Sequence, residues 1–101
     1  MKIDSEKISD VRVENTHYGY SCTALVSIDG EQRPFALLVP PSAFGEIEVR
    51  LGGRFGETEI ETLFRARIRR YIENGMLDAH PVRGSKVDLG VLDYREVDGL
   101  I

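Results

Sequence analysis

The segment His17-Tyr18-Gly19-Tyr20 places an imidazole and two phenols within four consecutive positions. Histidine can act as a general base near neutral pH, and tyrosine hydroxyls can donate or accept hydrogen bonds. This pattern is typical of a small-ligand pocket or a general-base site. The competing interpretation is an aromatic rim on a turn. We favour the rim, because the spacing places no serine, cysteine or carboxylate as a partner for His17.

Arg67 is the second candidate for a functional contact. At about 100° per residue of a helix, it falls inside an apolar stripe, between Leu63 and Phe64 and close to Tyr71. A charge in that position must be paired, must extend to water, or must face a partner. One interpretation is an anion contact or an interface hot spot. We favour a structural arginine, whose stem covers Tyr71 and whose head reaches water or a carboxylate of the sheet.

The glycine-rich loop 52–56 contains Arg54 and precedes the expected helix, a geometry that can hold a phosphate. The loop lacks the lysine and hydroxyl of a P-loop and the spacing of the dinucleotide fingerprint. Three glutamates within residues 57–61 would also repel a phosphate at this helix end. We therefore favour a flexible turn, and Arg54 stays a candidate contact residue.

Cys22 is the single cysteine of the chain and lies on the predicted core face. A catalytic thiol needs an electropositive and partly exposed setting, so we expect a buried small hydrophobe instead. A metal site could in principle combine Cys22, His17, Asp78 and His80. The sequence has no C-x-x-C and no H-x-x-x-H spacing, so the fold would have to bring these distant residues together. We predict no metal site, no cofactor and no catalytic residue.

Composition limits the functions that remain. The chain has 101 residues and a formal net charge of -4, which argues against a nucleic-acid binder. The arginines at 65, 67, 69 and 70 scatter over more than one helix face, and Glu61 and Glu73 offset them. No apolar run approaches the roughly 20 residues of a membrane span.

The start of the chain, residues 1–6, is polar and lacks the apolar stretch of a signal peptide. A single cysteine fits a reducing compartment. We therefore expect a cytoplasmic protein with no membrane segment. The length predicts a single domain over residues 1–101, with residues 1–7 and 95–101 frayed.

These side chains must be positioned by a sheet and a helix. Asp29-Gly30 predicts a two-residue hairpin turn in which Ile28 faces Glu31 and, along the strands, Ala24 faces Phe35. One face of this hairpin is then apolar. The other face is mixed, because apolar residues interrupt the polar ones at Leu25, Ala36 and Leu38.

Pro34 lies on the second strand of this hairpin, and its missing N–H points away from the hairpin partner. That strand is therefore an edge at Pro34, or its outer neighbour begins beyond Pro34. Residues 42–51 fit either a strand or a helix, and we favour the strand because β-branched residues occupy alternate positions.

One long helix is predicted over residues 59–74, and further strands near residues 11–14 and 86–91. The helix must bury its apolar stripe against the sheet. The predicted fold class is therefore α+β, a small antiparallel sheet with one long helix packed on one face in two layers. A homodimer is compatible with so small a core.

Residues 20–74 resemble a small bacterial family catalogued as domain of unknown function 1488. The resemblance lies in the hairpin segment Ala24–Gly30, the turn Arg54-Phe55-Gly56 and the helix segment Leu63–Arg67, about half of the chain. It implies a β-hairpin with a long helix packed on it, and members of the family usually carry a helix at residues 46–51. It implies no activity and no catalytic residue.

Two functions follow as hypotheses. The first is a non-enzymatic cytoplasmic module of bacterial type that acts through contact with a protein partner, as a small regulator or inhibitor, with a homodimer as a compatible state. The alternative is a small-ligand-binding or catalytic domain whose site combines His17, Tyr18 and Tyr20 with Arg67. The alternative requires these side chains to converge on a concave pocket.

Overall fold

Four strands form one sheet. The helical segments lie between the third and fourth strands in the chain and after the fourth strand. The computed structural model describes residues 7–28, 30–74 and 86–101. The strands occur in the spatial order β1-β2-β3-β4 and comprise β1 (Lys7–Thr16), β2 (Gly19–Ile28), β3 (Glu31–Val39) and β4 (Val87–Val91). The helical segments are η2 (Pro41–Ala43), α1 (Phe44–Arg50), α2 (Glu57–Glu73), η4 (Tyr94–Glu96) and α3 (Val97–Leu100).

The β2–β3 hairpin has the predicted register. Ile28 pairs with Glu31 and Ala24 pairs with Phe35, as the two-residue turn requires. Gly30 has φ of +82°, in the left-handed region that glycine enters freely, whereas Asp29 lies outside the described residues. The turn and the alternation of apolar residues therefore specify the same pairing.

β4 runs parallel to β3, so the sheet is mixed and the prediction of a purely antiparallel sheet was wrong at its last strand. The pairing begins at Phe35 with Val87, one residue beyond Pro34. This position confirms the second of the two predicted placements, in which the outer neighbour of the strand begins beyond Pro34. The parallel direction follows from the connection, because the chain leaves β3, passes through α1 and α2, and returns beside β3.

Residues 41–50 form η2 and α1, so the favoured strand at residues 42–51 was wrong. The exposed fractions show why the helical pattern prevails. Ile47 is fully buried, whereas Val49, which an alternating strand would bury beside it, is 74% exposed. Helical spacing brings Phe44 and Leu51 to the same side as Ile47, and both pack against the core.

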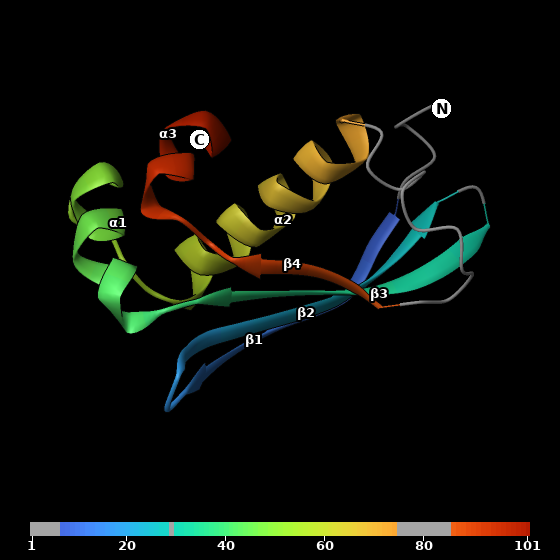
Figure 1. Cartoon of the computed structure of the whole chain (residues 1–101), viewed down its shortest axis with the longest axis horizontal. Helices are drawn as coiled ribbons and strands as arrows, with labels where there is room; N and C mark the ends of the chain where they lie inside the picture. Colours follow the sequence, from blue (N-terminus) through green and yellow to red (C-terminus); the bar gives the residue numbers. More distant parts are fainter. Residues whose placement is uncertain (1–6, 29, 75–85) are drawn as a thin grey trace.

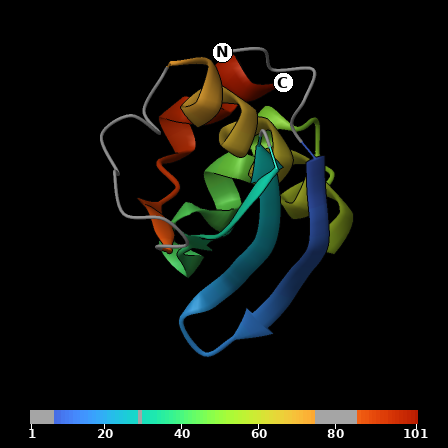
Figure 2. The ribbon, with the colours of Figure 1, turned by 90° about the vertical axis from the view of Figure 1, so that its right-hand side faces the viewer.

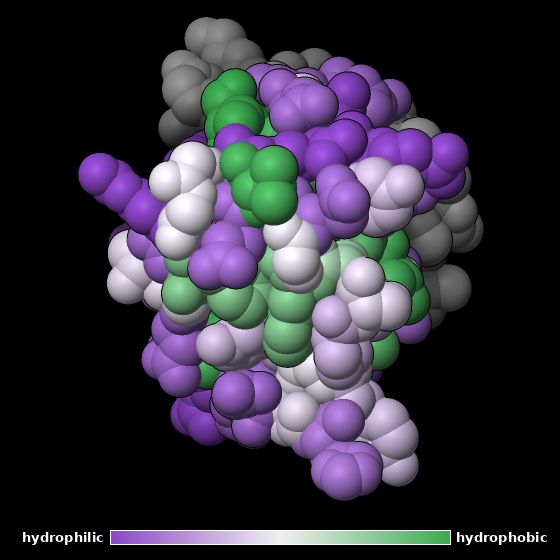
Figure 3. Space-filling view, turned by 90° about the vertical axis from the view of Figure 1, so that its left-hand side faces the viewer, coloured by the Kyte–Doolittle hydropathy of each residue, from purple (hydrophilic) through white to green (hydrophobic). Residues whose placement is uncertain are grey.

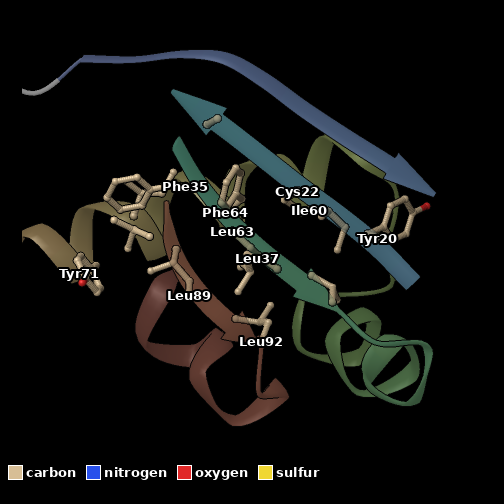
Figure 4. Packing of buried hydrophobic residues seen from close by; sticks show 14 of the residues in the cluster. Tyr20, Cys22, Phe35, Leu37, Ile60, Leu63, Phe64, Tyr71, Leu89 and Leu92 are labelled. Atoms are coloured by element: carbon tan, nitrogen blue, oxygen red, sulfur yellow. The ribbon is translucent and has the colours of Figure 1, made fainter. Parts of the chain in front are cut away.

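In the view of Figure 1, α2 and α3 lie above the sheet and α1 lies at the left-hand end of β3, so that no described helix covers the lower face of the sheet. The long helix α2 buries its apolar stripe on the sheet, which confirms the two-layer α+β prediction. Figure 4 shows these side chains directed into the layer between α2 and the strands. The largest fully buried side chains are Phe35, Phe64, Ile47, Ile60, Leu63, Ile68 and Leu92.

The end of the chain differs from the expectation that residues 95–101 fray. Asp93 caps η4 by accepting a hydrogen bond from the Arg95 N–H at 2.9 Å, and Glu96 completes a capping box. Val97, the first residue of α3, is fully buried, and Leu100 packs against the core. Residues 1–6, where fraying was also expected, lie outside the described part of the chain.

Candidate functional site

Arg67 forms an ion pair with Glu96 at the edge of the core. Its Nε lies 3.0 Å from Glu96 Oε2, and the two side chains are 22% and 30% exposed. The alignment is that of an ion pair and not of a hydrogen bond. Burial raises the pKa of the neighbouring Tyr71, and the positive charges of Arg33 and Arg67 partly oppose that rise. The sequence predicted that Arg67 reaches water or a carboxylate of the sheet. In the structure its partner is a carboxylate, but that carboxylate is Glu96 of η4 and not a residue of the sheet.

Arg50 plays a similar role and was missed by the sequence reasoning. Its guanidinium pairs with Glu46 at 2.9 Å within α1 and with Asp98 at 3.5 Å in α3. It also lies over the ring of Tyr94, 5.1 Å from the centroid. Arg50 and Arg67 thus hold the C-terminal segment against α1 and α2. Only the Glu46–Arg50 spacing could have been recognised in the sequence.

Arg54 is exposed and lines a shallow depression at the N-terminal end of α2. Glu59 lines the same depression, so an anion near Arg54 would also meet a carboxylate. The remaining lining residues are Leu51, Thr62, Leu63 and Ile101. This arrangement agrees with the charge argument against a phosphate at the glycine-rich loop.

His17 and Tyr18 form the exposed turn between β1 and β2. Their rings meet edge to face with centroids 5.9 Å apart, and Tyr18 is 74% exposed. The Thr16 hydroxyl holds the turn, because it donates to the Gly19 carbonyl at 2.7 Å and accepts from the Tyr18 N–H at 3.2 Å. This geometry corresponds to the aromatic rim on a turn.

Tyr20 is buried and belongs to an aromatic cluster with Phe44 and Phe55. The ring centroid of Tyr20 lies 5.4 Å from that of Phe44 and 5.8 Å from that of Phe55. Its hydroxyl oxygen points away from the packed side chains (Figure 4). Figure 3 shows the end of the molecule that carries α1, where hydrophobic atoms gather in the middle and hydrophilic atoms surround them. The cluster attaches α1 and the following loop to the sheet.

The candidate residues therefore do not form one site. His17 and Tyr18 contact each other at the turn, Tyr20 contacts Phe44 and Phe55, and Arg67 contacts Glu96. Within residues 7–28, 30–74 and 86–101, no hydrogen bond, ion pair or ring contact joins Arg67 to the His17–Tyr20 segment.

Cys22 is fully buried, which confirms the expected small hydrophobe. Burial raises the pKa of its thiol to about 12, so the nucleophilic thiolate is disfavoured at neutral pH. The described residues contain no cluster of three or more potential metal ligands. Asp78 and His80, two members of the four-residue combination, lie outside the described part of the chain.

The face of the sheet opposite α2 carries a second apolar surface. We call it the open-face strip, and its residues are Leu25, Pro34, Ala36, Leu38 and Val91. The register places them together, since Leu25 pairs with Pro34 and Leu38 with Val91. The residues on β2 and β3 are half-buried, and Val91 is 56% exposed.

The sequence held a signal for this surface. Leu25, Ala36 and Leu38 interrupt the polar side of the predicted hairpin, and that interruption is the open-face strip. What the sequence could not provide was the neighbouring position of Val91, because β4 was placed without a partner strand. The residues around the strip include Thr23, Gln32 and Asp88, which are exposed.

No described helix is both long and apolar enough to span a membrane. Comparisons of the chain with protein-family models, with curated proteins and with solved structures give no match.

Proposed function

We propose that the chain is a non-enzymatic protein-interaction module that binds an uncharged, apolar segment of another protein on its open-face strip. One observation carries the proposal: no described helix covers the face of the sheet opposite α2, and that face has apolar side chains where an alternating strand would place polar ones. Contiguous exposed apolar surface with a polar rim is a feature of interaction sites.

The chemistry of the strip defines the kind of partner. Its side chains at Pro34, Ala36 and Leu38 carry no charge and follow one strand at alternate positions. Exposed polar residues surround it, among them Thr23 and Asp88. Burial of such a centre inside a polar rim is the usual anatomy of a protein interface. A nucleic-acid ligand is disfavoured, because the formal net charge of the chain is -4.

The proposed setting is the cytoplasm of a bacterial cell, where a small regulator of this size would act by contact. The single buried thiol of the chain supports that setting. Resemblance to the bacterial family described above is part of the same proposal. Neither point affects the binding experiment, which depends on the strip alone.

The experiment compares proteins captured from the native cell by the wild-type chain and by two variants. Leu38→Asp places a charge in the open-face strip. Val49→Asp makes the same kind of change on α1, at a side chain that is 74% exposed and does not belong to the open-face strip. The far-ultraviolet circular dichroism of all three chains establishes that they are folded.

We expect at least one protein that is retained by the wild type and by Val49→Asp but is lost with Leu38→Asp. With that protein purified, we expect Leu38→Asp to weaken binding by roughly tenfold or more, as for a truncated interface centre. Equal retention by all three chains, or equal loss with Val49→Asp, would show that the strip is not the docking surface.

A further inference from the structure

The outer edge of β1 is a second feature that the described strands leave without a partner. β1 is the first strand of the sheet order, and no described strand pairs with its outer side (Figure 2, blue). An edge strand presents unpaired backbone N–H and C=O groups, which can pair with a strand of another chain. Natural edges are often protected by bulges and charges, so the residues of β1 determine whether pairing is possible.

The backbone groups that face outward can be identified from the register. Thr16 and Gly19 close a two-residue turn and form a hydrogen-bonded pair. Since hydrogen-bonded and non-hydrogen-bonded pairs alternate, Glu14 and Arg12 also direct their backbone groups to β2. The N–H and C=O groups of Val13 and its second neighbours along the strand therefore point to the open edge.

A bulge limits the part of this edge that is regular. The β1–β2 register shifts between Ser9 and Arg12, and Asp10 within that interval has φ of +52°. The pairing of β1 with β2 is therefore regular from Arg12 to Thr16, where the turn begins. Val13 lies between Arg12 and Glu14 in this regular stretch, so two copies of the stretch can pair antiparallel about Val13.

Charge complementarity selects this register from its neighbours. Arg12 and Glu14 are exposed, lie on the open face of the sheet, and form no ion pair with any described residue. With the two-fold axis at Val13, Arg12 of each copy stands opposite Glu14 of the other in a non-hydrogen-bonded pair, where side chains are closest. An axis at Arg12 or at Glu14 would instead place like charges opposite each other.

We propose that two copies of the chain associate through β1, antiparallel about Val13, with two symmetric Arg12–Glu14 contacts between the copies. Val13 itself is half-buried on the core side, so the two Val13 side chains meet at the axis and extend the cores. The axis is perpendicular to the sheet. The dimer therefore has one continuous sheet, with both α2 helices on one face and both open-face strips on the other.

The experiment uses charge reversal in the full chain and measures mass in solution over a range of concentrations by analytical ultracentrifugation. In a dimer of Arg12→Glu, each of the two contacts would bring two glutamates together, and in a dimer of Glu14→Arg each contact would bring two arginines together. Each single variant is expected to raise the dissociation constant of the dimer by roughly tenfold or more, because both symmetric contacts become repulsive.

Mixing the two single variants supplies the decisive result. In the mixed dimer, the glutamates of one chain face the arginines of the other at both contacts, so a heterodimer is expected although neither variant dimerises well alone. The double variant Arg12→Glu/Glu14→Arg should dimerise like the wild type. The control Glu48→Arg reverses an exposed charge on α1 and should leave the dissociation constant unchanged.

Val13→Pro tests the backbone pairing independently of charge. It removes the outward N–H at the axis but none of the hydrogen bonds to β2, so the chain should fold and lose the dimer. A wild-type chain that stays monomeric up to millimolar concentration overturns the proposal. So does a dimer that the charge variants and Val13→Pro leave intact. The open-face strip plays no part in this contact, so Leu38→Asp should still dimerise, and the proposed function can fail or stand separately.

Discussion

Arg67 Nε lies 3.0 Å from Glu96 Oε2, and this ion pair joins the middle of α2 to the turn that precedes α3. Both side chains are less than a third exposed, so neither charge is fully solvated when its partner is removed. A second contact, from Arg50 to Asp98, connects α1 to the same C-terminal segment. The last residues of the chain are therefore attached to both helices by charge as well as by the buried Val97.

Removal of Arg67 should destabilise the fold more than removal of an exposed arginine. We expect Arg67→Ala to lower the free energy of unfolding by about 1–3 kcal/mol, because it leaves Glu96 half-buried and without its partner. The measurement is equilibrium denaturation in urea. Arg54→Ala, which truncates an exposed arginine in the loop before α2, is the control and should have a clearly smaller effect, because solvent screens its charge.

A double-mutant cycle with Glu96→Ala separates the pair from the packing of the arginine stem. If the two single losses add in the double variant, Arg67 acts through its stem alone and the ion pair contributes nothing. A coupling of about 1 kcal/mol is the expected outcome for a pair with this degree of burial.

Leu37 and Leu38 are adjacent in β3 and should differ strongly in their response to truncation. Leu37 is 3% exposed in the core, so Leu37→Ala should cost about 2–5 kcal/mol of unfolding free energy. Leu38 lies on the open-face strip and is half-buried, so Leu38→Ala should cost about 1 kcal/mol or less. Thermal unfolding of both variants gives the comparison. Similar losses at the two positions would mean that something covers the open face.

This pair also illustrates what the sequence could predict. The Asp29-Gly30 turn fixes the β2–β3 register, because a shift by one residue would exchange the two faces and expose Phe35 and Val26. In this hairpin, the turn preference of Asp29-Gly30 and the burial of apolar side chains on one face favour the same register. The same agreement holds for α2, where the apolar stripe from Ile60 to Ile72 has helical spacing.

The errors arose where local patterns were degenerate. In residues 44–51 the β-branched residues alternate, and Phe44, Ile47 and Leu51 also lie at helical spacing. Only tertiary packing decides between these patterns, and it leaves Val49 in solvent. The direction of β4 depends on the path through α1 and α2, which alternation does not encode. The helical end of the chain was missed because residues 95–101 carry a short apolar signal, namely Val97, Leu100 and Ile101.

The candidate site was the least predictable part. Arg67 was recognised as a charge that needs a partner, but the partner, Glu96, is distant in the sequence and belongs to a segment expected to fray. For His17 and Tyr18 the favoured interpretation was an aromatic rim on a turn, and the structure places both residues on an exposed turn. A functional site requires its side chains to lie close together in space, and a single sequence does not give the distances between helices and strands.

Asp93 should titrate at unusually low pH. The hydrogen bonds that it accepts from the Arg95 side chain, followed by the one from the Arg95 backbone, lower the pKa of its carboxyl from 3.8 to about 2. Because the pKa is lower in the folded state, the associated stability is present above pH 3.8 and is lost as the pH falls through about 2. Arg95→Gln should move the pKa back toward 3.8, as followed by carboxyl carbon chemical shifts.

The matched control for Asp93 is Arg12→Gln, which removes a charge from β1 and should leave the Asp93 titration unchanged. An Asp93 midpoint near 3.8 in the wild-type chain would contradict the capping geometry of η4. The same conclusion would follow if Arg95→Gln had no effect.

Cys22 should be unreactive in the folded chain and should make stability fall at high pH. Burial raises the pKa of its thiol from 9.0 to about 12, so the folded state keeps the proton while the unfolded state loses it. Because the pKa is raised on folding, the full contribution is present below pH 9.0 and is lost as the pH rises toward 12. Urea denaturation across this interval should show a steeper loss for the wild type than for Cys22→Ala. A thiol reagent should label Cys22 only at the rate of unfolding, and rapid labelling of the native chain would show that the thiol is accessible.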